Sequence, residues 1–222
     1  MGTNITRNGS VSIAKGDDKS VYLSDLNYGA WKQNGGKLAT GVTDTEGEYS
    51  ISTGTAGAYA SATGVGFCGS FAKVGVIIEI ESGSSDDLLE IVPTVQYEGY
   101  LGVNGAGTGK IQIGGEVANA GASDFVKIDS DDHVDHSPLL MESKTGGVGY
   151  ADSWNDTVVM DGSDGDSPLY INSPEAGDKY RVDVYGATTS EVALSYASID
   201  SNAGGKGVID DLTLANMQFN WV

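Results

Sequence analysis

Two stretches of alternating apolar and polar residues make up most of the segment from Val74 to Leu101. Successive side chains of a β-strand point to opposite faces, so each stretch places an apolar row on one face and a polar row on the other. The polar segment 82–87 separates the two stretches, and a Gly/Ser/Asp turn between alternating runs predicts a β-hairpin. The apolar row comprises Val74, Val76, Ile78, Ile80, Leu89, Ile91, Val95, Tyr97 and Leu101. The opposite, acidic face carries Glu79, Glu81, Glu90 and Glu98.

The rest of the chain repeats this kind of pattern at shorter length. No run of ten or more residues keeps an apolar stripe at helical spacing. Short alternating runs, separated by turn signals roughly every 8 to 12 residues, are typical of sandwiches and jelly rolls. We therefore predict an all-β fold, a jelly-roll-like β-sandwich with long Gly/Asp-rich loops and little or no helix. A single domain over residues 1–222 is expected, with residues 1–20 forming an N-terminal arm or edge strand.

Three features predict where strands break or end. Glycine-rich segments predict a break at Gly102–Gly109 and a hairpin turn at Gly186–Ser190. Pro93 has no N–H for a ladder, so it predicts a bulge or an edge position. The last strand, ending at Val222, has one apolar face, which predicts a strand embedded in the fold or in an interface. The expected interface residues are Met217, Phe219 and Trp221.

The charge balance excludes several classes of partner. Thirty-one acidic residues against twelve basic ones give a formal net charge of -19. Nucleic acids and anionic membranes are poor partners for such a chain, because phosphate contacts require Lys and Arg. The hydrophobic share of 39% argues against disorder. We interpret the composition as that of a folded domain adapted to high salt, where self-repulsion is screened.

Two acidic loops contain candidate metal ligands. The first holds both histidines of the chain, and imidazole with carboxylate is a ligand set for divalent transition metals. Its candidate ligands are Asp131, His133, Asp135 and His136. The second loop presents Asp161, Asp164 and Asp166, carboxylates suited to Ca²⁺, although the spacing departs from that of an EF-hand. Solvated acidic surface turns explain both loops without a metal, and we favour that interpretation over metal binding.

Catalytic signatures are missing from the sequence. Residues 105–110 (GAGTGK) fail as a phosphate loop because Asn104 and Ile111 occupy its required Gly and Ser/Thr positions. No G-x-S-x-G elbow is present, and the two histidines share one loop, which argues against a catalytic triad. The four glutamates of the acidic face fit a solvated surface better than a glycosidase pair, because few aromatic residues accompany them. Cys68 is expected to be a small buried residue. We expect no enzymatic activity.

The Gly-rich turns, acidic composition and strand at the C-terminus resemble the β-rich decoration, turret and tail proteins of haloarchaeal tailed viruses. The resemblance spans the chain and is one of composition. It implies a non-catalytic structural protein of the virion or of an extracellular surface, associating with itself and with other structural proteins. The start of the chain has no apolar segment of signal-peptide type, and no apolar run reaches membrane-spanning length.

Two alternatives remain open. One is an extracellular filament subunit. The other is a carbohydrate- or calcium-binding adhesin module of β-sandwich type, for which an aromatic patch would be the distinguishing feature. The candidates for that patch are Tyr28, Trp31, Tyr150 and Trp154.

Overall fold

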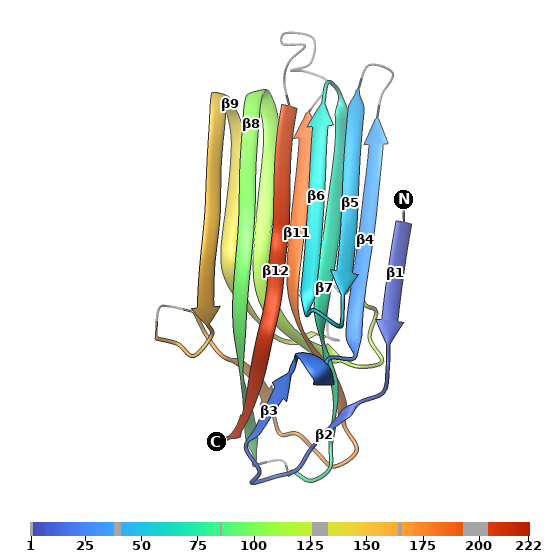
Figure 1. The fold of residues 1–222 in the computed structure, drawn as a ribbon, viewed down its shortest axis with the longest axis vertical. Coiled ribbons are helices and arrows are strands. Elements are labelled where there is room, and N and C mark those ends of the chain that lie inside the picture. The colour runs from blue at the N-terminus through green and yellow to red at the C-terminus, as the bar shows by residue number, and fades with distance from the viewer. Residues whose placement is uncertain (1, 38–40, 85, 126–132, 164–165, 193–203) are drawn as a thin grey trace.

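The computed structural model describes residues 2–37, 41–84, 86–125, 133–163, 166–192 and 204–222, and these residues are almost entirely β-strand (Figure 1). The one helical element in this part of the chain is the 3₁₀ turn η1 (Leu23–Asp25). None of the described residues forms a helix long and apolar enough to cross a membrane. The strands are β1 (Gly2–Arg7), β2 (Val11–Ile13), β3 (Lys19–Tyr22), β4 (Tyr28–Lys37), β5 (Val42–Ser50), β6 (Thr55–Thr63), β7 (Gly66–Ile80), β8 (Leu88–Asn119), β9 (His133–Val159), β10 (Leu169–Asn172), β11 (Lys179–Val192) and β12 (Gly204–Trp221).

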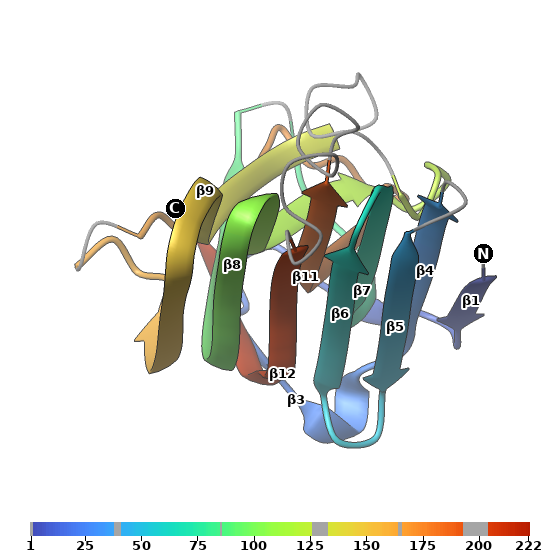
Figure 2. The same cartoon turned by 90° about the horizontal axis from the view of Figure 1, so that it is seen from above.

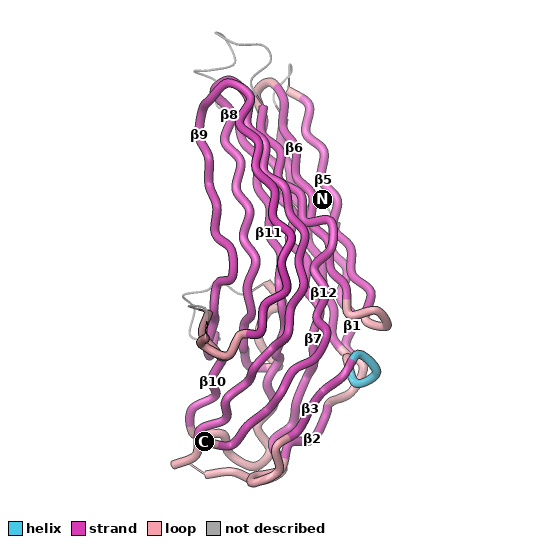
Figure 3. Tube along the Cα trace, turned by 60° about the vertical axis from the view of Figure 1, so that its left-hand side comes forward, coloured by secondary structure: helices cyan, strands magenta, loops and turns pink. Residues whose placement is uncertain are grey.

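The strands form two layers, confirming the predicted β-sandwich (Figure 2). The back sheet has the order β1-β4-β7-β11, continuing into the second half of β8. The front sheet has the order β5-β6-β12, continuing into the first half of β8. The long strands run along the long axis of the molecule (Figure 3). Strand β1 lies at the edge of the back sheet.

Strand β8 belongs to both layers. Residues 89–104 pair with β12, whereas residues 108–119 pair with β11. Strand β9 stays antiparallel to β8 on both sides of the crossing, with register shifts around Gly105. Gly105 and Gly146 have positive φ angles there, a conformation that glycine adopts without steric cost. The predicted break at Gly102–Gly109 is therefore a bend, and the paired crossing gives the sandwich its jelly-roll-like character.

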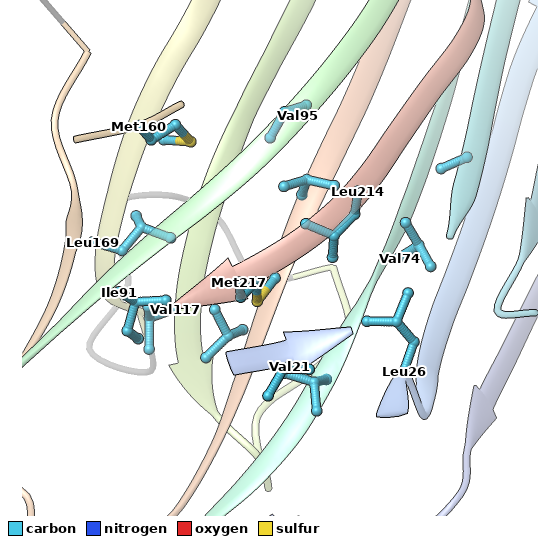
Figure 4. Packing of buried hydrophobic residues seen from close by; sticks show 14 of the residues in the cluster. Val21, Leu26, Val74, Ile91, Val95, Val117, Met160, Leu169, Leu214 and Met217 are labelled. Atoms are coloured by element: carbon cyan, nitrogen blue, oxygen red, sulfur yellow. The ribbon is translucent and has the colours of Figure 1, made fainter. Parts of the chain in front are cut away.

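The main core lies between the sheets, where the two predicted apolar rows meet (Figure 4). All nine side chains of those rows are buried. The predicted hairpin is wrong, however, because β7 pairs with β4 and β11 while β8 pairs with β12 and β9. Alternation identifies the buried face of a strand and carries no information about its pairing partner. The predicted acidic face divides as well: Glu79 lies on the back sheet, and Glu90 and Glu98 lie on the front sheet.

Two further local predictions change in the folded chain. Strand β11 runs without a turn through 186–190, and a Cβ on Gly186 would lie 2.7 Å from Ile209 Cδ1. Glycine at 186 thus permits close packing of the two sheets. The irregularity expected at Pro93 appears on the partner strand, as a register shift between Leu214 and Asn216. Cys68 is fully buried, as predicted.

The C-terminal strand β12 is internal to the front sheet. It pairs with β8 along one edge and with β6 and β3 along the other. Met217 and Phe219 are fully buried in the core, and the partly buried Trp221 donates from Nε1 to the Ala14 carbonyl at 2.8 Å. The expected interface role of Met217 and Phe219 is therefore replaced by a core role, because neither has surface left for a partner.

Deleting residues 213–222 is expected to prevent folding, because it removes Leu214, Met217 and Phe219 from the core. Loss of a single buried large side chain already costs about 2–5 kcal/mol. Far-UV circular dichroism and a thermal melt check this, with loss of the cooperative transition as the expected result. Deleting Val222 alone, which is 75% exposed, is the control: it removes one backbone hydrogen bond, to the Leu88 carbonyl at 3.0 Å, and no buried side chain, so a cooperative melt should remain. A truncated chain that remains a folded monomer contradicts the prediction.

Candidate functional site

The outer face of the back sheet is divided into a covered half and an open half. Register partners in antiparallel strands share a face, so the side chains of β4, β7, β11 and β8 form rows across the sheet. One such row is Asn34, Gly69, Thr189 and Lys110, and the next is Lys32, Phe71, Ala187 and Gln112. Farther along the strands, the segment 119–125 packs over the sheet, with Phe125 and Ala120 against Tyr28 and Ile77.

An ion cluster is buried under this covering segment. Its members are Lys73, Glu116, Arg181 and Asp183, and none is more than 2% exposed. The Lys73 ammonium pairs with Glu116, and Arg181 donates from Nε to Asp183 Oδ2 at 2.9 Å. Arg181 also donates from Nη2 to Glu116 Oε1 at 3.2 Å. Opposite charges thus alternate across three strands, which offsets the cost of removing them from water.

The cluster also holds the covering segment in place. Arg181 donates from Nη1 to the Ser123 carbonyl at 3.4 Å, and its guanidinium lies 5.1 Å from the centre of the Tyr28 ring. Tyr28 donates its phenol proton to Asp124 Oδ1 at 3.1 Å, and Arg7 donates to the same oxygen at 2.7 Å. The chain has only these two arginines, so its strongest cations act in structure.

Burial shifts the acidity of several groups in the cluster. Desolvation and, next, the charge of Glu116 raise the pKa of Asp183 to about 7, against the opposing charges of Lys73 and Arg181. Desolvation, followed by the charge of Asp183, raises the pKa of Tyr28 far above its usual value. Asp183 Oδ1 has no hydrogen-bond partner among the described residues. A carboxyl group with a free buried oxygen is favoured in its neutral form, in agreement with the raised pKa.

The open half of the face contains a groove, which we call the Phe67 groove. A hollow of about 260 Å³ lies over β4, β7 and β11, and a second of about 270 Å³ lies over β11 and β8. They share Phe67, Ala187 and Thr189, so they form one continuous depression. The small residues Gly69 and Ala187 leave this space free. The groove is defined by Asn34, Phe67, Phe71, Gln112, Phe125 and Thr189.

Aromatic rings form the walls of the Phe67 groove. Phe71 stacks on Tyr185 with ring centres 5.7 Å apart and an interplanar angle of 16°. Phe125 meets the Phe71 ring edge-on, with ring centres 5.7 Å apart and an interplanar angle of 80°. Phe67 is 44% exposed, an unusual position for a phenylalanine. The Lys32 ammonium lies 5.5 Å from the centre of the Phe125 ring at one end of the groove.

The predicted metal loops are only partly described. Asp131, Asp164 and the side chain of His133 lie outside the described residues. Asp135 accepts hydrogen bonds from the backbone N–H groups of Tyr170 at 2.7 Å and His136 at 2.9 Å, which ties β9 to β10. Asp161 accepts from the Ser163 N–H at 2.9 Å, within its own turn. The described residues contain no group of three or more potential ligands, and metal binding at these positions and at Asp166 remains a prediction.

The four aromatic candidates do not gather on one surface. Tyr28 is fully buried, Trp31 and Trp154 pack against the core, and Tyr150 lines a hollow on the front sheet. The sequence contains a signal for the aromatic residues of the Phe67 groove. Phe67, Gly69 and Phe71 alternate in the phase opposite to the buried Val74, which places them on the outer face.

The raised pKa of Asp183 predicts a pH dependence of stability. A carboxyl group with a higher pKa when folded stabilises the fold most below its ordinary pKa of 3.8, and this contribution is lost as the pH rises through about 7. Asp183→Asn removes the titration. From about pH 4 to pH 8, we expect the unfolding free energy of the wild type to fall relative to that of the variant, measured by denaturant titration. Asp17→Asn, at an exposed position, is the control and should follow the wild type. A pH-independent difference for Asp183→Asn contradicts the assignment.

Comparison with known proteins identifies no family. No family model and no curated protein matches the sequence. Among solved structures, the chain is similar to the family 11 carbohydrate-binding module from Clostridium thermocellum in complex with a β-1,3-1,4-mixed-linked tetrasaccharide, at 12% identity and a TM-score of 0.30, covering 83% of this chain and 88% of that chain. It is also similar to the family 11 xylanase from Neocallimastix patriciarum (9% identity, TM-score 0.25, 82% and 100% covered). A third similarity is to the structure of infectious bursal disease virus, Gx strain, at 10% identity and a TM-score of 0.22, covering 92% of this chain and 40% of that chain. At these TM-scores the similarities carry no information about function.

Proposed function

We propose that the protein binds a carbohydrate chain in the Phe67 groove and performs no chemistry on it. The exposed Phe67 ring beside an open hollow is the observation that carries this proposal. A sugar presents apolar C–H groups on the faces of its ring and hydroxyl groups around its rim. Phenylalanine rings suit the faces, and amides, hydroxyls and ammonium groups suit the rim. Asn34, Gln112 and Thr189 supply such polar groups within the groove.

The position of the groove disfavours other polymers. It lies on the face of a sheet whose backbone groups already pair with neighbouring strands, so a peptide cannot bind there by adding a strand. Among the described lining residues, Lys32 and Lys110 are the only cations, too few for a nucleic acid on a chain of net charge -19. Three strand spacings of about 4.8 Å separate β4 from β8, which gives the groove a width of roughly 14 Å.

The carboxylates of the groove favour binding over hydrolysis. Glu191 is the one carboxylate among its described lining residues. Glycoside hydrolysis ordinarily needs two carboxyl groups about 5–10 Å apart, on either side of the bond that is cleaved. A single carboxylate serves as a hydrogen-bond acceptor for sugar hydroxyls. Such a module would act on an extracellular or virion surface, where glycans are encountered.

Phe67→Ala is expected to weaken glycan binding about tenfold or more, because burial of such a ring contributes about 1.5–3 kcal/mol. Ala187→Leu should abolish binding, because the leucine side chain would fill the hollow that both halves of the groove share. A glycan array identifies a ligand, and isothermal titration calorimetry then measures each variant. Val42→Ala, which trims an exposed apolar residue on the front sheet, is the control. Wild-type protein that binds no glycan, or two groove variants that bind as well as the wild type, would refute the proposal.

A second candidate function is a structural component that self-associates on a virion or extracellular surface. Strand β5 ends the front sheet, pairing with β6 and with no other described strand, and open edges recruit strands from other chains. Its Asp44, Glu46 and Glu48 repel a second copy at low salt. We therefore expect association, together with a higher melting temperature, to appear as the salt concentration rises. Light scattering and thermal melts across a salt series check this, and a monomer at every salt concentration contradicts it.

A further inference from the structure

A separate hollow of about 360 Å³ opens on the outer face of the front sheet, opposite the Phe67 groove. Lys206 of β12 lies at its centre, paired in register with Ser61 of β6 and Gly102 of β8. These partners share one face of the sheet. Tyr100 and Asn104 flank Gly102 on the same face, and Tyr150 of β9 contributes to the rim. We call this depression the Lys206 hollow.

The floor of the Lys206 hollow is an aromatic ring held against the sheet. A Cβ on Gly102 would lie 2.6 Å from Tyr100 Oη and 2.9 Å from Tyr100 Cε1. The Tyr100 ring therefore occupies the space that a side chain at residue 102 would take, which is possible only with glycine there. Tyr100 is only partly buried, so part of the ring remains accessible beside Lys206. That arrangement provides a platform for a flat ligand.

Rings also position the cations of the hollow. The Lys206 ammonium lies 5.6 Å from the centre of the Tyr100 ring and 5.5 Å from that of Tyr59. On the rim, the Lys144 ammonium lies 4.7 Å from the centre of the Tyr150 ring. Both contacts are within cation–π range, so the two flexible side chains have preferred positions. Neither lysine forms an ion pair with a carboxylate in the described part of the chain.

The charge of the hollow contrasts with that of the protein. The chain has 31 acidic residues, yet none is among the residues that line this depression. Carboxylates do lie nearby: Asp44 and Glu46 are the register partners of Ser61 and Tyr59, and Asp152 accepts a hydrogen bond from the Tyr150 phenol. The lining itself combines an ammonium group with the hydroxyls of Ser61 and Thr63 and the Asn104 amide. Its charge is therefore complementary to a single anionic group surrounded by hydroxyls.

We propose that the Lys206 hollow binds a sugar that carries a carboxylate, with the carboxylate against Lys206 and the sugar ring on Tyr100. A uronate residue has this chemistry. The described lining contains no arginine fork and no helix N-terminus, the groups best suited to phosphate. This site is distinct from the Phe67 groove, because it lies on the other sheet. The chain would then hold glycans on both faces, one of them selected by charge.

The test compares two ligands that differ in one group. Oligoglucuronate and oligoglucose of the same linkage and length differ only at C6, which is the carboxylate carbon in the first and a CH₂OH group in the second. Titration calorimetry near 1 M salt screens the repulsion from the net charge of -19, since the Debye length there is about 3 Å. Wild-type protein should bind the glucuronate at least about tenfold more tightly, the value of one charged hydrogen bond.

Variants assign the binding to one face. Lys206→Gln and Tyr100→Ala should each lose the preference for glucuronate, whereas Lys32→Gln, which removes a cation from the Phe67 groove, should retain it. Thermal melts confirm that each variant is folded. The proposal is overturned by equal affinity for the two ligands, by no binding of glucuronate, or by loss of the preference in Lys32→Gln with retention in Lys206→Gln. Loss of neutral glycan binding in Phe67→Ala alone would leave it standing.

Discussion

The relative placement of the two sheets depends on strand β8, which forms hydrogen-bonded ladders in both. Its first half pairs with β12 and its second half with β11, while β9 accompanies it across the bend. Gly105 and Gly146 adopt positive φ angles at the crossing, so the direction changes without ending the strand. Because the ladder continues from one layer into the other, the apolar faces of β7 and β8 are brought together across the core. Every side chain on the outer faces is positioned by that arrangement.

The buried ion cluster connects this framework to the candidate binding surface. Removing one partner of a buried ion pair leaves an uncompensated charge and costs about 3–5 kcal/mol, whereas an exposed pair contributes about 0–1 kcal/mol. Arg181 and Asp124 therefore tie the covering segment to the back sheet far more firmly than surface pairs would. The same segment includes Phe125, whose ring meets Phe71 at the wall of the Phe67 groove. A structural cluster thus positions one side of the proposed ligand site.

Both proposed sites depend on small residues beside aromatic ones. Gly69 leaves room between Phe67 and Phe71, and Gly102 leaves the space in which the Tyr100 ring lies. A larger side chain at either glycine would cover the ring or displace it. The two surfaces differ in charge, because Glu191 accompanies the lysines of the groove and no carboxylate lines the Lys206 hollow. This difference is the physical basis for assigning them different ligands.

Alternation with period two is a local property of an extended backbone, so the amino-acid sequence predicts an all-β chain and the buried face of each long strand. The same alternation places Phe67 and Phe71 opposite the buried Val74, in phase with the outer face. The folded chain was needed to show that β7 and β8 lie in different sheets, that β12 is an internal strand, and that Ala187 lies beside Phe71. These outcomes depend on register between residues far apart in the chain. Such pairing is selected by packing across the whole core and leaves no periodic signal in either strand.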